Sequence, residues 1–197
     1  MTAKTTTFYY DLGSPYAYLA AERIAEAIPG EIAWQPVSLG GLFKANGRSS
    51  WSLGDPERRR IGMAEIERRA REYGLAPLHW PDPWPTDYLF AMRVATYAFT
   101  RERGREFTMR AFRDAFQHGH DLGIRDNVLR AAVEVGLDPQ AAAGAASEDA
   151  IKLGLRAATE AAHDLGVFGV PTIAVAGELF WGDDRLGEAA ARRDLNV

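Results

Sequence analysis

Cysteine is absent from all 197 positions of the chain. This absence excludes disulfide bonds, zinc sites built on thiolates and redox chemistry by a CxxC pair. Any thiol chemistry carried out by this protein therefore needs a thiol that comes from outside the chain.

Two further absences narrow the class of protein. No stretch is long and apolar enough to span a membrane, and the first residues lack the apolar core of a signal peptide. The net charge is −4, with Lys and Arg dispersed among Asp and Glu, so the basic face that nucleic-acid binding usually requires is missing. The sequence predicts a cytoplasmic protein that binds neither a membrane nor nucleic acid.

Apolar residues make up 47% of the chain, which is enough for a sizeable core in one domain, or in one domain with a large insertion. Residue periodicity and turn signals predict strands and helices at both ends of the chain. The turn Ala176-Gly177 is expected to join two of the strands as a hairpin. The expected strands are Thr5–Tyr10, Glu31–Val37, Thr172–Val175 and Glu178–Trp181, and the expected helices are Pro15–Ile28 and Arg185–Arg192.

Between these ends, residues 39–165 carry almost no strand signal, and their apolar residues recur at helical spacing. The order of elements predicts an α/β thioredoxin-like fold with a large all-helical insertion. The expected division is a thioredoxin-like domain of residues 1–38 and 166–197 and an inserted helical domain of residues 39–165. The helices expected in the insertion are Pro56–Tyr73, Asp87–Arg103, Glu106–His118, Asn127–Val135, Pro139–Ala146 and Glu148–Leu165.

Two segments far apart in the sequence predict a functional site. Ser14 begins the first expected helix, where unpaired N–H groups and the helix dipole favour an anion and where a hydroxyl can donate to a thiolate. Val170 and Pro171 precede the third strand, and a cis bond there would leave the Val170 backbone free to pair with an extended peptide. A thioredoxin-like site combines two such features, and without a thiol of its own it points to glutathione as cofactor. A simple N-cap and an ordinary trans proline are the structural alternatives.

Charged residues suggest further binding groups. Asp183 and Asp184, at the start of the last expected helix, could hold the ammonium of a γ-glutamyl group or simply cap that helix. Lys44 could bind a carboxylate or be solvated. The pair His118 and His120 is too small a ligand set for a metal site, and we predict none.

Aromatic residues could line a substrate pocket or belong to the core: Trp80, Trp84, Tyr88 and Trp181. Nucleotide-binding fingerprints are missing. A Ser-His-Asp hydrolase is not indicated, because position 16 is Tyr16 rather than the second glycine of Gly-x-Ser-x-Gly.

Several segments, in order along the whole chain, resemble the 2-hydroxychromene-2-carboxylate isomerases, bacterial relatives of DsbA and of kappa-class glutathione transferases. The final motif, from Val-Pro-Thr to Trp-Gly-x-Asp-Arg, is the most specific. The segments are Gly13-Ser14-Pro15-Tyr16-Ala17-Tyr18-Leu19, Gly40-Gly41-Leu42-Phe43-Lys44, Ala91-Met92-Arg93, Phe168-Gly169-Val170-Pro171-Thr172 and Glu178-Leu179-Phe180-Trp181-Gly182-Asp183-Asp184-Arg185-Leu186.

The resemblance implies a glutathione site and a homodimer. It implies that Ser14 touches the thiol, that Val170, next to Pro171, pairs with the backbone of the glutathione cysteine, and that Lys44 lies near the glycine carboxylate. It places Asp183 and Asp184 at the γ-glutamyl end. The substrate pocket is expected to include Tyr16, Arg48, Trp84, Tyr88 and Trp181.

Four residues depart from the family pattern: Arg48 and Asp87 where Asn is usual, Ile61 where Tyr is usual, and Arg69 where Trp is usual. The resemblance implies a glutathione-dependent isomerase of an aromatic 2-oxo acid in aromatic catabolism. Adding a thiolate to a conjugated double bond makes that bond temporarily single and free to turn. A kappa-like glutathione transferase and a non-catalytic thioredoxin-fold binding protein remain the alternatives.

Overall fold

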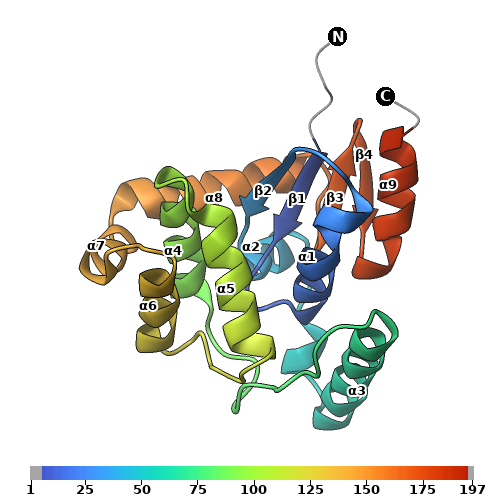
Figure 1. Ribbon diagram of the computed structural model, residues 1–197, viewed down its shortest axis with the longest axis horizontal. Coiled ribbons are helices and arrows are strands. Elements are labelled where there is room, and N and C mark those ends of the chain that lie inside the picture. Colours follow the sequence, from blue (N-terminus) through green and yellow to red (C-terminus); the bar gives the residue numbers. More distant parts are fainter. Residues whose placement is uncertain (1–5, 195–197) are drawn as a thin grey trace.

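A four-stranded mixed sheet, in the order β2-β1-β3-β4, joins the two ends of the chain in the computed structural model, which describes residues 6–194 (Figure 1). Strand β1 (Thr6–Tyr10) is parallel to β2 (Ile32–Pro36) and antiparallel to β3 (Thr172–Val175), which pairs with β4 (Glu178–Trp181). Tyr9 lies opposite Thr172. The segment that follows β1 and the segment that precedes β3 therefore meet at one end of these two central strands.

Helices pack around this sheet and fix the position of the strand ends where the two segments meet. Helix α1 (Pro15–Ala27) packs against α9 (Leu186–Asp194), and α9 also packs on β3 and β4. Helix α8 (Asp149–Asp164) packs on β2 and on the short helix α2 (Leu39–Ala45). The first turn of α1 suits its sequence, because Pro15 has no N–H to leave unpaired there.

The helical segment between β2 and β3 confirms the predicted thioredoxin fold with a helical insertion. Tyr10 of β1 packs on Phe112, with ring centroids 5.9 Å apart, and its hydroxyl lies 2.6 Å from the hydroxyl of Thr108. One hydrophobic core therefore runs from the sheet into the insertion. The division into two separate domains stays a prediction. The insertion contains α3 (Pro56–Glu72), α4 (Leu89–Thr100), α5 (Gly104–Phe116), α6 (Arg125–Glu134) and α7 (Pro139–Ala145), beside α2 and α8.

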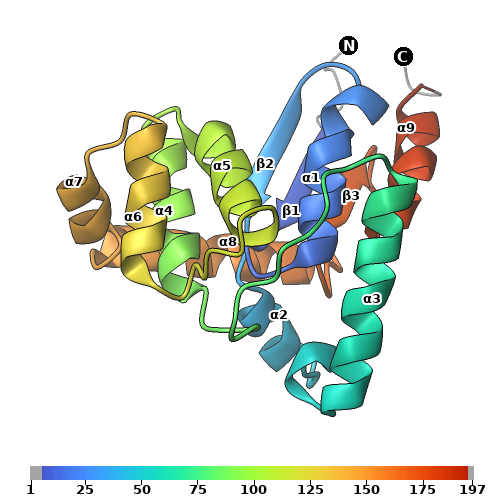
Figure 2. The same ribbon diagram turned by 60° about the horizontal axis from the view of Figure 1, so that its bottom comes forward.

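Helix α3 (Pro56–Glu72) stands apart from the other insertion helices, at the end of the molecule near α1 and α9 (Figure 2). It contacts α1 and the 3-10 turn η1 (Trp51–Leu53). Its sequence is rich in Arg and Glu, and only Ile66 and Ala70 are fully buried. Few buried apolar side chains therefore anchor α3, and the polar contacts of Arg69 and Tyr73 with Asp183 add to them.

Most predicted elements are confirmed to within a few residues at their ends, and both strands of the hairpin match fully. Ala176 and Gly177 have positive φ angles of 52° and 86°, as a tight hairpin turn requires. The predicted start of β1 at Thr5 lies outside the described residues. Helix α2 and the turn η1 were not predicted, nor was the 3-10 turn η2 (Asp183–Arg185) before α9.

Two classes of structure are absent from residues 6–194. None of the helices there is long and apolar enough to cross a membrane. Over the same residues, no group of three or more His, Asp or Glu side chains is arranged to hold a metal ion.

Candidate functional site

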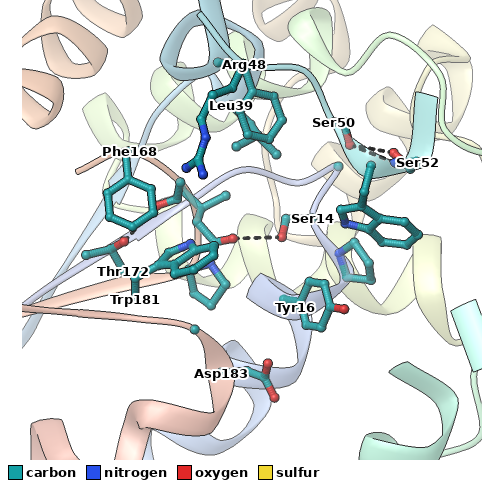
Figure 3. Close-up of a pocket in the computed structure, with 18 of the residues that line it drawn as sticks. Ser14, Tyr16, Leu39, Arg48, Ser50, Ser52, Phe168, Thr172, Trp181 and Asp183 are labelled. Carbon is teal, nitrogen blue, oxygen red and sulfur yellow. Dashed lines mark hydrogen bonds between the residues drawn. The ribbon is translucent and has the colours of Figure 1, made fainter. Parts of the chain in front are cut away.

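A cavity of about 710 Å³ opens where the β1–α1 turn meets the loop before β3 (Figure 3). Its walls come from the start of α1, from α2, from η1 and from η2. The fold thus collects predicted site residues from distant parts of the chain around one cavity. Those that line it are Ser14, Tyr16, Arg48, Trp84, Val170, Pro171, Trp181, Asp183 and Asp184.

Ser14 caps α1 and also faces the X-Pro loop. Its hydroxyl oxygen accepts a hydrogen bond from the Ala17 N–H at 3.2 Å and donates to the Val170 carbonyl at 3.4 Å. The Val170-Pro171 bond is cis. Within the described residues the Val170 N–H has no hydrogen-bond partner. The start of α1 therefore presents a hydroxyl and a positive dipole end beside an unpaired backbone donor.

The turn that carries Ser14 is held by Asp11, which is only 6% exposed. Its carboxylate accepts from the Gly13 N–H at 2.8 Å and from the Leu39 N–H at 2.7 Å. Burial raises the pKa of Asp11 to about 6, although the two N–H bonds oppose that rise. Sequence reasoning missed this residue. The signal was a carboxylate directly after an apolar strand and directly before the Gly-Ser turn.

Tyr88 lies behind this turn rather than in the cavity wall. A Cβ added to Gly13 would sit 2.5 Å from the Tyr88 ring, so the two are in close contact. Tyr88 is absent from the residues that line the cavity. Its ring supports the turn from the core side, and its contribution to the substrate pocket stays a prediction.

The two acidic residues have different surroundings. Asp183 is 1% exposed, and its oxygens accept from Arg69 Nη1 at 2.9 Å and from the Tyr73 hydroxyl at 3.0 Å. Burial raises the pKa of Asp183, and Arg69 opposes the rise. The Asp184 side chain is 59% exposed and lies 3.7 Å from Arg69. Arg69, one of the departures from the family pattern, thus forms an ion pair with Asp183, one of the two acids predicted to hold a γ-glutamyl ammonium. Asp184 is the more accessible of the two.

The predicted caps of the last helix also differ. Gly182 precedes η2 with a φ of 116°, and neither aspartate makes a side-chain cap there. The carboxylate of Asp183 turns instead toward α3. The prediction that these acids cap the final helix is wrong, because Arg69 and Tyr73 of the neighbouring segment offer stronger partners.

Two basic residues of the α2 region lie in different places. Arg48 lines the cavity, with its guanidinium carbon 5.5 Å from the centre of the Phe168 ring, and it has no ion-pair partner among the described residues (Figure 3). Lys44 lines a second cavity between α2 and α8. Phe43 faces the first cavity, and on a helix the next residue points about 100° away. The structure therefore does not bring Lys44 to the Ser14 cavity.

Aromatic rings form two walls of the cavity. Phe168 and Trp181 pack at 4.8 Å on one side, and Trp181 is 49% exposed. Trp51 packs between Tyr16 and Trp84 on the other side. The buried indole N–H of Trp84 has no partner in the described structure. The cavity suits a flat, aromatic ligand that also carries a polar group.

Trp51 and Phe168 were not predicted as pocket residues, because helical or strand periodicity does not reveal which loop aromatics face a cavity. Trp80 lies behind Trp84, with ring centroids 4.7 Å apart, and its N–H donates to Glu67. It is absent from the cavity lining and packs against the core, which is the second of the two alternatives for this residue.

Comparisons with known proteins identify similar chains over nearly the whole length. The model of the DSBA-like thioredoxin domain matches residues 5–192. The 2-hydroxychromene-2-carboxylate isomerase of Sphingobium xenophagum is 30% identical over 188 residues, which cover 93% of this chain and 94% of that protein.

Solved structures show the same fold. A structure of 2-hydroxychromene-2-carboxylate isomerase superposes with a TM-score of 0.85 and 22% identity, covering 98% of this chain and 95% of the other. The cytosolic disulfide reductase DsbM from Pseudomonas aeruginosa with GSH gives a TM-score of 0.66 and 18% identity, covering 98% and 96%.

Proposed function

This chain belongs to the DsbA-like thioredoxin-domain family and, within it, to the 2-hydroxychromene-2-carboxylate isomerases, and from this membership we propose that it isomerises an aromatic 2-oxo acid with glutathione as its cofactor. The observation that carries the proposal is the hydrogen bond between Ser14 and the Val170-Pro171 loop in the wall of an aromatic cavity. The chain has no cysteine, so the thiol for such a site comes from a bound molecule.

The residues present fit glutathione, which carries a thiol, two carboxylates and an ammonium. The Ser14 hydroxyl and the start of α1 suit the thiolate, because both stabilise negative charge. The unpaired Val170 N–H suits a peptide carbonyl, and the exposed Asp184 suits the ammonium. When bound, glutathione supplies a thiol that adds reversibly to a conjugated double bond and so permits that bond to rotate.

The rest of the cavity suits the substrate. Arg48 is a cation without an ion-pair partner in the described part of the chain, and its guanidinium can receive the carboxylate of a 2-oxo acid. Phe168 and Trp181 offer ring faces for an aromatic group.

We place the protein in the cytoplasm, where reduced glutathione is abundant, and we propose that it acts in aromatic catabolism as a homodimer. Its partners are then a small aromatic substrate and a second copy of the chain. Sedimentation equilibrium of the purified protein measures its oligomeric state directly. We expect a single species of twice the chain mass.

An isomerisation assay tests the proposed function. Purified protein is mixed with 2-hydroxychromene-2-carboxylate, and the approach to its open-chain isomer is followed by absorbance with and without glutathione. We expect turnover only with glutathione, a large loss in Ser14→Ala, and no change in Ser147→Ala, an exposed serine outside the cavity. Turnover that ignores glutathione would overturn the proposal. Stable glutathione adducts of electrophiles, without isomerisation, would favour a transferase instead.

A further inference from the structure

We propose that Asp11 is a positioning residue that makes the geometry of the Ser14 turn depend on pH. Asp11 is absent from the residues that line the cavity, so it would act through the turn that carries Ser14. Its effect on the turn rests on the structure alone, whereas the consequence for glutathione rests on the proposed function.

The Asp11 carboxylate links two walls of the cavity that belong to different parts of the chain. One oxygen holds the Gly13 N–H of the β1–α1 turn, and the other holds the N–H of Leu39, the first residue of α2. Ser14 and Leu39 both line the cavity. A single buried side chain therefore ties the start of α1 to the start of α2, in addition to the backbone bond from the Val37 N–H to the Tyr10 carbonyl.

The turn has little freedom to adopt another arrangement. The Ser14 N–H donates to the Asp11 carbonyl at 3.0 Å, and the Leu12 N–H donates to the Met92 sulfur at 3.1 Å. The Tyr88 ring closes the space beside Gly13. Each N–H from Leu12 to Ser14 thus has a fixed partner, and the Gly13 N–H depends on the ionised Asp11.

Burial, and then the nearby Asp87, disfavour the ionised form of Asp11. Asp87, just before α4, is a like charge that raises its pKa, and Tyr10 and Tyr88 are neutral groups that interact with it. Asp11 forms no ion pair within residues 6–194. Burial is the largest cause, and it brings the pKa of Asp11 to about 6, so the carboxyl changes charge just below neutral pH.

Protonation weakens one acceptor in this link. A carboxylate accepts through both oxygens, but the O–H of a carboxylic acid donates, so it would face an N–H of Gly13 or Leu39. One of the two bonds is then weakened, because a hydroxyl oxygen is a poorer acceptor than a carboxylate oxygen, and the N–H with the weaker partner favours movement of its segment. Below about pH 6 the Ser14 turn and α2 are therefore tied together less firmly.

The first test follows the amide resonances of Gly13 and Leu39 by NMR from pH 5 to pH 7.5, without any ligand. We expect both to titrate together near pH 6 in the wild type. In Asp87→Asn the midpoint should move to lower pH, because a like charge is removed while the asparagine oxygen can still accept from Leu89 N–H. In Asp11→Asn the transition should disappear, because the amide does not titrate. Flat resonances in the wild type, or a midpoint that Asp87→Asn leaves in place, would overturn the proposal.

The second test measures glutathione affinity over the same pH range. In the wild type we expect it to fall by about tenfold below the Asp11 transition, the effect of one weakened charge-assisted hydrogen bond on a preorganised site. In Asp11→Asn we expect weak binding without that step. A wild-type affinity that shows no step while the amides titrate would overturn the coupling to the site. Titrating amides with no glutathione binding at any pH would support the positioning role and would instead reject glutathione as cofactor.

Discussion

At the residue scale, Arg48 is the cavity residue that we propose selects a substrate with a carboxylate. It replaces a usual Asn and brings a full charge to the wall beside Phe168. Replacing it with Gln should raise KM for an aromatic 2-oxo acid by roughly tenfold, the low end for a charge-assisted bond at an exposed side chain. The KM for the methyl ester of the same acid should hardly change.

Steady-state kinetics on the acid and the ester measure this difference. Arg101→Gln, an exposed arginine at the end of α4, is the matched control and should leave both values unchanged. Equal losses for acid and ester in Arg48→Gln would show that Arg48 does not bind the carboxylate.

Gly13 is the second residue at which a small change should have a large effect. A Cβ there would lie 2.5 Å from the Tyr88 ring, so Gly13→Ala should destabilise the fold by about 1–3 kcal/mol through overpacking. Urea denaturation measures the loss. Gly144→Ala is the control, because its added Cβ meets nothing within 4 Å and lies within α7. A Gly13→Ala protein as stable as Gly144→Ala would contradict the close contact.

The sequence could predict Ser14 and Val170 as site residues because each has a local signature, a helix start and an X-Pro turn. It could not place Arg69 or Trp51, whose partners are distant in the chain, and it missed the contact by which Asp11 reaches Leu39. Lys44 shows the same limit from the other side. Its neighbour Phe43 lines the Ser14 cavity, but Lys44 itself points elsewhere because it lies on α2. Helix α2 is hard to predict from the sequence, because Gly40 and Gly41 are poor helix formers.

At the scale of elements, α3 is attached to the site by its polar residues. Arg69 and Tyr73 bind Asp183 of η2, and Arg23 of α1 lies 3.5 Å from the centre of the Tyr73 ring. Replacing Arg69 with Met leaves Asp183 buried with fewer partners. Because Arg69 is itself partly exposed, we expect a loss of about 2–3 kcal/mol, less than for a fully buried pair.

Chemical denaturation tests the contribution of these contacts between α3 and Asp183 to stability. Arg71→Met, an exposed arginine on the same helix, should cost little and is the control. Tyr73→Phe should cost about 1 kcal/mol, the value of one hydrogen bond. If Arg69→Met is as stable as Arg71→Met, the Asp183 pair contributes nothing to holding α3.

Elements were predicted well where the residue pattern was long or sharply bounded. The hairpin strands have β-branched and aromatic residues on both sides of a clear turn, and α1 has Ser14 and Pro15 at its start. The short turns η1 and η2 were missed because three residues carry no periodicity.

At the scale of the whole molecule, Asp11 should leave a mark on stability as a function of pH. Its pKa is raised from 3.8 to about 6 in the folded state, so the folded protein binds this proton more tightly than the unfolded chain. Stability from this group is therefore present below pH 3.8 and is lost as the pH rises toward 6. The full effect is roughly 3 kcal/mol, since each pKa unit corresponds to about 1.4 kcal/mol.

Comparing the wild type with Asp11→Asn isolates this contribution, because other carboxylates are common to both. The unfolding free energy of the wild type, relative to that of Asp11→Asn, should fall as the pH rises from 4 to 6.5. Urea titrations at each pH measure it. A difference that stays constant over this range would show that Asp11 has the same pKa in the folded and unfolded protein.

The central claim is that Ser14 and the start of α1 bind the thiolate of glutathione. Calorimetric titration of the wild type and of Ser14→Ala with reduced glutathione at pH 7.5 tests it most directly. The account predicts an affinity in the micromolar to millimolar range for the wild type and about tenfold weaker binding for the variant, because one hydrogen bond to a charged sulfur is lost. Absence of binding by the wild type, or equal affinities for the two proteins, would contradict it.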